Sequence, residues 1–485
     1  MRSGFHKPER GGIIIRPVNM LQDSVAKLLF RLSLPTTTGM IIYSLFSLID
    51  TFFVAKLGAL SFAALTLVIP LQILLISVSS ATGVGLTSLI GRTLGSGNVK
   101  LADNVAWHGV VISFLYGGLS VGLGLHYIDS LLIIFGSTPE TFALSREYMR
   151  IVLWGSLFTF LPMTLGNIIQ GEGNTFIPMV ISLLGISLNV VFDPIFIFGW
   201  AGMPALGLNG AAVATVLSQM VTTVVIIALA KRKTSKLTWS RANFRPSLRV
   251  VSEIYRVGFP AMIMEVVSVV NLAIINRTLT GYSYTAVAAL GIFLRIRSLA
   301  YMPVHGLAQG TMPIASFAYG ARLFDRVKET IIKSSTLAFV FLGTGWLIMQ
   351  YQPAWVMQFF SQDPMLTVVG ITCMQMATLF LPLMGPLVIL YTILQAVGKG
   401  FTAMWLSLTR QVVFFLPLLL ILPRYYSLNG VWLAFSISEI LTASVALIFL
   451  ISLWRELQVR NKFTVVMLLK GGYLLERLQA WLRWK

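Results

Sequence analysis

The chain has 485 residues, of which 56% are hydrophobic and only 11% are charged, and its formal net charge is +19. A soluble domain carries charge on about a quarter of its residues, so this composition excludes an ordinary soluble protein and indicates a chain that lies largely in lipid. The basic residues lie between and beyond the apolar runs, not on one solvated face, so we expect no nucleic-acid partner. The single cysteine, Cys373, excludes internal disulfides and a cysteine metal cluster.

Apolar runs long enough to cross a bilayer recur almost to the end of the sequence. A hydrocarbon layer of about 30 Å needs about 20 apolar residues in a helix. In chain order, the predicted membrane-spanning helices lie at residues 27–50, 60–90, 104–125, 141–170, 176–200, 208–230, 252–276, 285–315, 329–350, 365–396, 402–422 and 430–453. The expected fold class is therefore an all-α membrane protein with twelve transmembrane helices.

Basic residues gather in three segments outside these spans: a head (1–26), a linker (231–249) and a tail (454–485). With twelve spans, all three lie on the same side of the membrane, and the positive-inside rule makes that side cytoplasmic. We therefore expect a multi-pass protein of the cell (inner or plasma) membrane with both termini in the cytoplasm. The end of the tail places apolar and basic residues on opposite helical faces, which predicts an amphipathic helix on the inner leaflet.

The second half of the sequence repeats the first. One constant shift along the chain aligns several pairs, namely Arg31 with Arg256, Pro35 with Pro260, Gly85 with Gly310 and Gln170 with Gln395. Each half holds six spans and inserts in the same sense, which predicts two six-helix bundles, 27–230 and 250–453, related by a pseudo-two-fold axis normal to the membrane. Parallel repeats of this kind leave a cleft between two rocking lobes, which favours a secondary transporter over a scaffold.

Four acidic residues lie inside the apolar spans, Asp50, Asp193, Glu265 and Glu439. An ionisable side chain in the membrane costs about 3 kcal/mol or more, so function is the first hypothesis at such positions and a buried ion pair is the alternative. No basic residue lies near Asp50 or Asp193 in the spans of the first half, except Arg31 at the entrance. Unpaired carboxyl groups suit reversible protonation, and they equally suit Na⁺, a hard cation that favours oxygen ligands.

Polar neighbours accompany both aspartates. Tyr43 shares a helical face with Asp50, and Asn189 precedes Asp193 by about one helical turn. In the second half, Arg295, Arg297 and Arg410 lie within or near the spans, together with Glu439. Because a buried arginine needs a partner, we expect Glu439 to form a structural ion pair with Arg410 or Arg295.

Several motifs of the chain are similar to those of one transporter family. They are, in order, LPTTTGMIIYSLFSLIDTFFVAKLG (34–58), GNIIQGEGNT (166–175), NVVFDPIFIFG (189–199), LNGAAVAT (208–215) and FLRIRSLAYMPVHGLAQGTMPIASFAYGA (293–321). They resemble multidrug and toxic compound extrusion (MATE) transporters, and the last resembles the DinF-like, largely prokaryotic branch. The resemblance covers residues 27–453 and implies a V-shaped, two-lobed antiporter that exports drugs or organic cations in exchange for H⁺ or Na⁺.

The resemblance also implies a set of site residues. Asp50 and Asp193 match the aspartates that bind the coupling cation in the first lobe, and Asn189 and Thr215 match the residues that complete that site. These four would be the ligands of Na⁺ if Na⁺ is the coupling ion, and no other cofactor is expected. Asn167 matches an asparagine that lines the same cavity.

In the second half, the family's NorM-type pattern uses acidic residues on the seventh and tenth helices. The predicted tenth span has no acidic residue, and Glu265 lies closer to Pro260 than in that pattern. A second-lobe Na⁺ site is therefore not expected. Glu265 and Tyr43 are secondary candidates for the coupling site.

Two other functions stay open. The three arginines of the second half keep a flippase for a lipid-linked or polysaccharide precursor as the main alternative. An intramembrane enzyme is more remote, because the spans contain no paired catalytic motif, and the lack of a P-loop excludes an ATP-driven pump in this chain. We expect no enzyme activity, a monomer, and two kinds of partner, small lipophilic or cationic substrates and the lipid bilayer.

Overall fold

The computed structural model describes residues 19–230, 235–360 and 363–482, so most of the basic head and the start of the linker lie outside the described residues. The regular secondary structure of this part of the chain is helical. The helices of the first half are α1 (Val25–Ala55), α2 (Ala59–Gly95), α3 (Val99–Ile134), α4 (Pro139–Trp154), α5 (Ser156–Gly171), α6 (Phe176–Phe198) and α7 (Leu208–Ala230), with the short η1 (Trp200–Gly202). The linker holds η2 (Arg241–Asn243).

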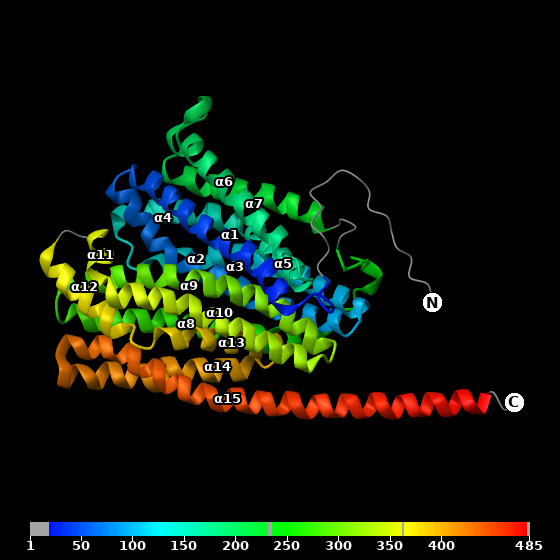
Figure 1. Ribbon diagram of the computed structural model, residues 1–485. Coiled ribbons are helices and arrows are strands. Elements are labelled where there is room, and N and C mark those ends of the chain that lie inside the picture. Colours follow the sequence, from blue (N-terminus) through cyan, green and yellow to red (C-terminus); the bar gives the residue numbers. More distant parts are fainter. Residues whose placement is uncertain (1–18, 231–234, 361–362, 483–485) are drawn as a thin grey trace.

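The second half continues with helices that lie below the first half in Figure 1. They are α8 (Leu248–Thr280), α9 (Tyr284–Gly320), α10 (Phe324–Tyr351), α11 (Pro353–Gln358), α12 (Pro364–Ala377), α13 (Leu381–Ala396), α14 (Gly400–Leu408), the π-helix η3 (Thr409–Phe415) and α15 (Leu416–Leu482). The all-helical, two-bundle prediction is thus confirmed.

Twelve crossings account for these helices. Among the described residues, nine helical segments are long and apolar enough to span a membrane, and two bent pairs, α4 with α5 and α12 with α13, add one crossing each. The last of the nine, Gly400–Lys462, holds two crossings, because the backbone breaks at Ser427 (φ 50°, ψ −134°) and the chain turns back on itself there (Figure 1). The predicted number of spans is confirmed.

The internal repeat extends to the positions where helices begin and break. Helices α2 and α9 have 37 residues each, and their first residues, Ala59 and Tyr284, are equivalent in the repeat. Helices α4 and α12 both begin at a proline, and Pro139 and Pro364 are again equivalent positions. Each of these two helices is followed by a bend, of 49° and 55° respectively. Proline suits the first turn of a helix because the amide hydrogen that it lacks would have no partner there.

The two bundles pack against each other reciprocally. Helix α1 contacts α9, and its counterpart α8 contacts α2. A Cβ atom on Gly95 would clash with the carbonyl of Phe317, and one on Gly320 would clash with the carbonyl of Arg92, a pair of contacts that the internal repeat exchanges. Two contacts that are exchanged in this way when the halves are exchanged indicate a two-fold axis between the halves.

All these close contacts lie at one end of the molecule, beside the linker and the start of α1. Polar groups reinforce them there. The hydroxyl of Tyr255 on α8 hydrogen-bonds with those of Tyr116 on α3 and, at 3.1 Å, Thr82 on α2. Ser88 of α2 donates to the carbonyl of Gln395 on α13 at 2.6 Å. The lobes are therefore closed together at the basic end.

The linker is bound to the first lobe. The Asp103 carboxylate on α3 accepts hydrogen bonds from the backbone amide of Thr238 at 2.9 Å and the side chain of Asn243 at 2.8 Å. One turn further along α3, His108 Nε2 accepts from the Ser247 amide at 3.0 Å, while its Nδ1 lies 2.8 Å from the carbonyl of Asn104. These groups hold the linker against the basic end of α3.

A second attachment lies just beyond α5. The Glu172 carboxylate accepts hydrogen bonds from Ser235 and from the Lys236 amide at 2.7 Å. The Lys236 ammonium lies 4.8 Å from the centre of the Phe317 ring on α9. Burial raises the pKa of Glu172 and lowers the pKa of Lys236, with their hydrogen bonds and mutual attraction opposing both shifts. The linker thus touches both lobes.

The tail differs from the expected surface helix. Helix α15 continues without a break from the last crossing to Leu482 and projects beyond the bundle (Figure 1). The helix predicted for the end of the tail, from Gly472 on, is thus present as far as Leu482, but it extends along the axis of the last span instead of turning onto a surface. The predicted apolar and basic faces concern side chains beyond residue 462, which lie outside the described residues.

Candidate functional site

A cavity of about 740 Å³ lies between the two lobes. Its wall comes from α1, α2 and α5 to α7 on one side and from α8, α9 and α13 on the other. Amide and hydroxyl side chains are frequent in it, and Met40, Met163 and Met312 add flexible apolar surface. Among the described residues of the wall, Glu265 is the one acidic side chain, and there is no lysine or arginine.

Next to this cavity, the first lobe holds a polar cluster built on α6 and α7. Asn189 and Asp193 are one turn apart on α6, so their side chains lie on the same face, and the Asn189 amide donates to Asp193 Oδ1 at 3.2 Å. The same amide nitrogen lies 3.3 Å from the hydroxyl oxygen of Thr215 on α7, which in turn donates to the carbonyl of Ala211 at 2.9 Å. Asn189 and Thr215 line the cavity, whereas Asp193 is fully buried behind them.

The carboxyl group of Asp50 reaches this cluster from α1. It interacts directly with the carboxyl group of Asp193. The second carboxyl oxygen of Asp193, Oδ2, is buried and accepts no hydrogen bond from an amide or hydroxyl group. Two adjacent carboxyl groups out of water cannot both be ionised at low cost, so this pair needs a proton or a cation between its oxygens.

Two residues that the sequence did not single out surround the pair. The Tyr148 side chain on α4 lies within electrostatic range of both Asp50 and Asp193, and its hydroxyl accepts a hydrogen bond from Gln72 of α2 at 3.3 Å. The internal repeat could have singled out one of them, Gln72, because it aligns with Arg297, a charged residue inside a span of the second half. Tyr148 aligns with the buried Cys373 and has no such signal.

The remaining first-lobe candidates have separate positions. Tyr43 lines the cavity within electrostatic range of Asp50. Asn167 also lines the cavity, but its side-chain amide donates to the backbone carbonyl of Met163 on its own helix at 2.8 Å. Its backbone carbonyl accepts from the hydroxyl of Thr87 on α2 at 2.9 Å. These contacts give Asn167 a role in packing α5 against α2, apart from the carboxyl pair.

Glu265 faces the cavity from the second lobe. Its carboxylate accepts hydrogen bonds from Ser77 and, at 3.5 Å, from Ser80, both on α2 of the first lobe. Glu265 therefore lies where α8 and α2 separate above the closed end, and it is not part of the Asp50–Asp193 pair. Its position is therefore in the wall of the central cavity.

The expected ion pair of the second lobe has a different arginine. Glu439, 2% exposed, accepts from Arg297 at 3.4 Å, and the guanidinium of Arg297 stacks over Phe293, Tyr301 and Phe435. The predicted partner Arg295 is exposed, so this part of the prediction is wrong. Positions 295 and 297 are about 200° apart around a helix, and only one of them can face the bundle.

The other predicted partner, Arg410, belongs to the same cluster without a direct ion pair. Its guanidinium acts electrostatically on Tyr391 and on Glu439. Arg410 lies in the π-helix η3, where the widened turn frees backbone groups, and Asn271 of α8 donates to the carbonyl of Gln411 there at 3.1 Å.

This two-bundle architecture can be compared with known proteins. The MatE family model matches the chain twice, at residues 35–195 and 260–421, and the two matches begin at equivalent positions of the internal repeat, Pro35 and Pro260. The multidrug export protein MepA of Staphylococcus haemolyticus is 25% identical over 448 residues, which cover 92% of this chain and 96% of that protein. An FAD transporter of Shewanella oneidensis is 26% identical over 430 residues and covers 87% of this chain and 93% of its own length.

The structural comparison agrees. The outward-facing conformation of a multidrug resistance MATE family transporter superposes with a TM-score of 0.83 at 28% identity, covering 93% of this chain and 100% of that one. The two family matches together span most of the sequence, and each lies within one of the two bundles. This chain is a member of the MATE family of membrane transporters.

Proposed function

We propose that this chain exports lipophilic organic cations in exchange for H⁺ or Na⁺ bound at Asp50 and Asp193. The observation that carries the proposal is the link between the cavity and the carboxyl pair. Asn189 and Thr215 line the cavity, and the Asn189 amide is hydrogen-bonded to both Asp193 and Thr215. Cation binding at the pair therefore changes the hydrogen bonds of the wall that a substrate touches.

Both coupling ions fit the residues of the pair. The two carboxyl groups can share one proton, which removes the repulsion between them. The oxygens of Asp50, Asp193, Asn189 and Thr215 also suit Na⁺, and the buried Asp193 Oδ2 has no hydrogen-bond partner among the described residues. For Na⁺, the Asn189 amide would rotate to present its oxygen, because its nitrogen makes the present contacts.

The wall of the cavity favours a cationic substrate. Glu265 supplies a negative charge at the junction of the lobes, and the methionines adapt to apolar groups of varied shape. Arg297 and Arg410 form the separate second-lobe cluster, and Arg295 is exposed. Among its described residues the wall thus contains one imidazole, His305, and none of the lysines or arginines that bind a phosphate-bearing substrate, whether a lipid-linked precursor or a dinucleotide such as FAD.

The charge distribution indicates which side of the membrane the closed end of the lobes faces. The lobes are closed at the end that carries the linker and the start of the chain. By the positive-inside rule this end faces the cytoplasm, with both termini. We assign the structure to a state in which the cavity is closed to the cytoplasm.

Reconstituted protein tests this proposal. In proteoliposomes with an imposed H⁺ or Na⁺ gradient, a cationic dye such as ethidium should be transported, and FAD should not. Glu265→Gln should raise the half-saturating concentration of the dye roughly tenfold, the value of one charge-assisted contact. The exposed Glu140→Gln is the matched control and should behave as wild type. Gradient-driven transport of FAD or a lipid-linked sugar, without transport of any cation, would overturn the proposal in favour of the alternative.

A further inference from the structure

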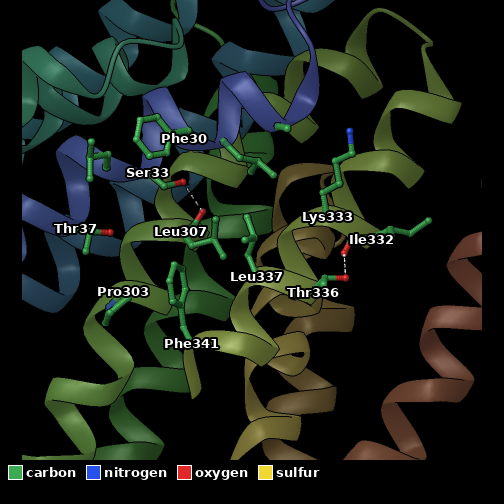
Figure 2. A pocket seen from close by; sticks show the side chains of 13 residues that line it. Phe30, Ser33, Thr37, Pro303, Leu307, Ile332, Lys333, Thr336, Leu337 and Phe341 are labelled. Atoms are coloured by element: carbon green, nitrogen blue, oxygen red, sulfur yellow. Dashed lines mark hydrogen bonds between the residues drawn. The ribbon is translucent and has the colours of Figure 1, made fainter. Parts of the chain in front are cut away.

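A second cavity, of about 790 Å³, lies away from the central one and shares none of its lining residues. It is a groove between α1 of the first lobe and α9 and α10 of the second (Figure 2). It begins beside the first turn of α1, at Ala26, and extends along the helix to Thr37. The groove therefore crosses the junction of the lobes at the basic end.

The groove is built for an apolar occupant. Its lining includes Phe30, Leu34, Leu337 and Phe341, each at least 40% exposed on the outside of the bundle. The hydroxyl of Thr336 is used within its own helix, donating to the carbonyl of Ile332 at 2.9 Å (Figure 2). Since α1, α9 and α10 are membrane spans, the medium outside this groove is lipid.

One end of the groove is positively charged. Lys333 is eight residues before Phe341 on α10, which places their backbones about 12 Å apart along the helix, and Figure 2 shows its ammonium pointing away from Phe341. Lys333 is paired with Glu329 at 2.6 Å. The first ten residues of α10 nevertheless carry three basic and two acidic side chains. At the start of α1, Lys27 is paired with Asp23 at 2.7 Å, and Arg31 adds a further positive charge.

An apolar channel that is open to lipid and ends at an excess of basic groups has the chemistry of a phospholipid site. We propose that the groove binds an anionic phospholipid of the leaflet at the basic end, with an acyl chain between α1, α9 and α10 and the phosphate beside Lys333. Because α1 belongs to one lobe and α9 and α10 to the other, the bound lipid bridges the lobes. It stabilises the arrangement in which they touch at this end.

Photolabelling of the full-length protein tests the site. Wild type in phosphatidylcholine vesicles is labelled with phosphatidylglycerol that carries a diazirine in its acyl chain, and the adducts are mapped by mass spectrometry. The label should concentrate on 26–37 and 332–341, and unlabelled phosphatidylglycerol should compete better than phosphatidylcholine. Leu337→Trp, which fills the groove, should abolish this labelling. Val340→Trp, on the same helix but outside the lining, should retain it.

The headgroup is tested separately. Lys333→Gln should remove the preference for phosphatidylglycerol, whereas Lys100→Gln, an exposed lysine on α3, should leave it intact. Labelling spread evenly over all lipid-facing helices and unchanged by Leu337→Trp would overturn the proposal. So would labelling of the groove by a photoreactive lipophilic cation that phosphatidylglycerol does not displace, since the groove would then belong to the transported substrate.

Discussion

The two lobes carry their buried charge differently at equivalent positions. Arg297 and Glu439 form the ion pair of the second lobe. The shift of the repeat aligns Arg297 with Gln72, and towards the end of each half a shift shorter by five residues, which aligns Gly210 with Gly430, aligns Glu439 with Gln219. Both equivalents in the first lobe are therefore neutral. The first lobe instead holds a carboxyl pair without a basic partner among the described residues. Glu439 has a guanidinium beside it, whereas the carboxyl pair of the first lobe has none, so we infer that the first lobe exchanges the coupling cation and that the second-lobe pair stabilises the fold.

This difference predicts distinct effects for two neighbouring arginines. Arg297→Gln leaves Glu439 buried without its cation and should cost about 3–5 kcal/mol of stability. Arg295→Gln removes an exposed side chain and should change stability little. Thermal unfolding of the purified variants measures both. A stable Arg297→Gln protein that has lost gradient-driven transport would show that the second-lobe pair takes part in coupling.

At the residue level, the sequence predicted contacts within one helix better than contacts between helices. The spacing of Asn189 and Asp193 sets their shared face, because four residues make about one turn of a helix. The choice between Arg295 and Arg297 depends on the rotation of α9 against α15, and the partner Glu439 is 142 residues from Arg297. The sequence of α9 alone does not determine that rotation.

Among the elements, α2 and α9 close the molecule through their glycines. Added Cβ atoms on Gly95 or Gly320 would meet backbone carbonyls of the opposite lobe, which cannot move aside as a flexible side chain does. Gly95→Val and Gly320→Val should therefore both shift the protein toward a state that is open at the basic end. Gly118→Val, on α3 with nothing near its Cβ, is the control.

Spin labels placed on α3 and α10 at the basic end report this change as a distance between lobes. The two glycine variants should lengthen it, and the control should not. Because the native Cys373 is buried, labels on added cysteines can be placed without removing it. Equal distance distributions in all three variants would contradict the role of these contacts in closing the lobes.

The linker depends on one carboxylate of α3 in particular. Asp103→Ala removes the hydrogen bonds that hold the Thr238 amide and Asn243, and the linker should detach at this point. Trypsin should then cleave at Arg241 and Arg245 faster than in wild type. Asp129→Ala, which breaks an exposed pair with Arg146, should leave the cleavage rate unchanged. An equally resistant linker in both variants would show that other contacts suffice.

The sequence located the elements well but not their interruptions. The predicted spans 141–170 and 365–396 are each divided, at Gly155 and at Thr378–Phe380. Pro382 lies in the first turn of α13, directly after the second break, but Pro162 and Pro386 lie inside continuous helix, because neighbouring helices in a membrane protein satisfy the freed backbone groups. Composition therefore predicts a crossing, while the place where it bends depends on the packing around it.

For the whole molecule, the duplicated sequence explains the axis, the closed end and the central cavity together. Gly91 lies against Ser316, its own equivalent in the internal repeat, so the axis passes between them. The halves are held together on this side of the cavity, and rocking about the axis would open one end as it closes the other. The sequence could predict the axis from the repeat, but not the state in which the structure lies, since both states share one sequence.

The central claim is that the Asp50–Asp193 pair binds the cation that drives export. Its most direct measurement is gradient-driven efflux of a lipophilic cation from proteoliposomes containing wild type, Asp50→Asn or Asp193→Asn, under a pH gradient and under a Na⁺ gradient. Each asparagine keeps the shape and removes the exchangeable charge, so both variants should fold, bind the substrate and lose gradient-driven transport. Wild-type transport rates in both variants under both gradients would contradict the account.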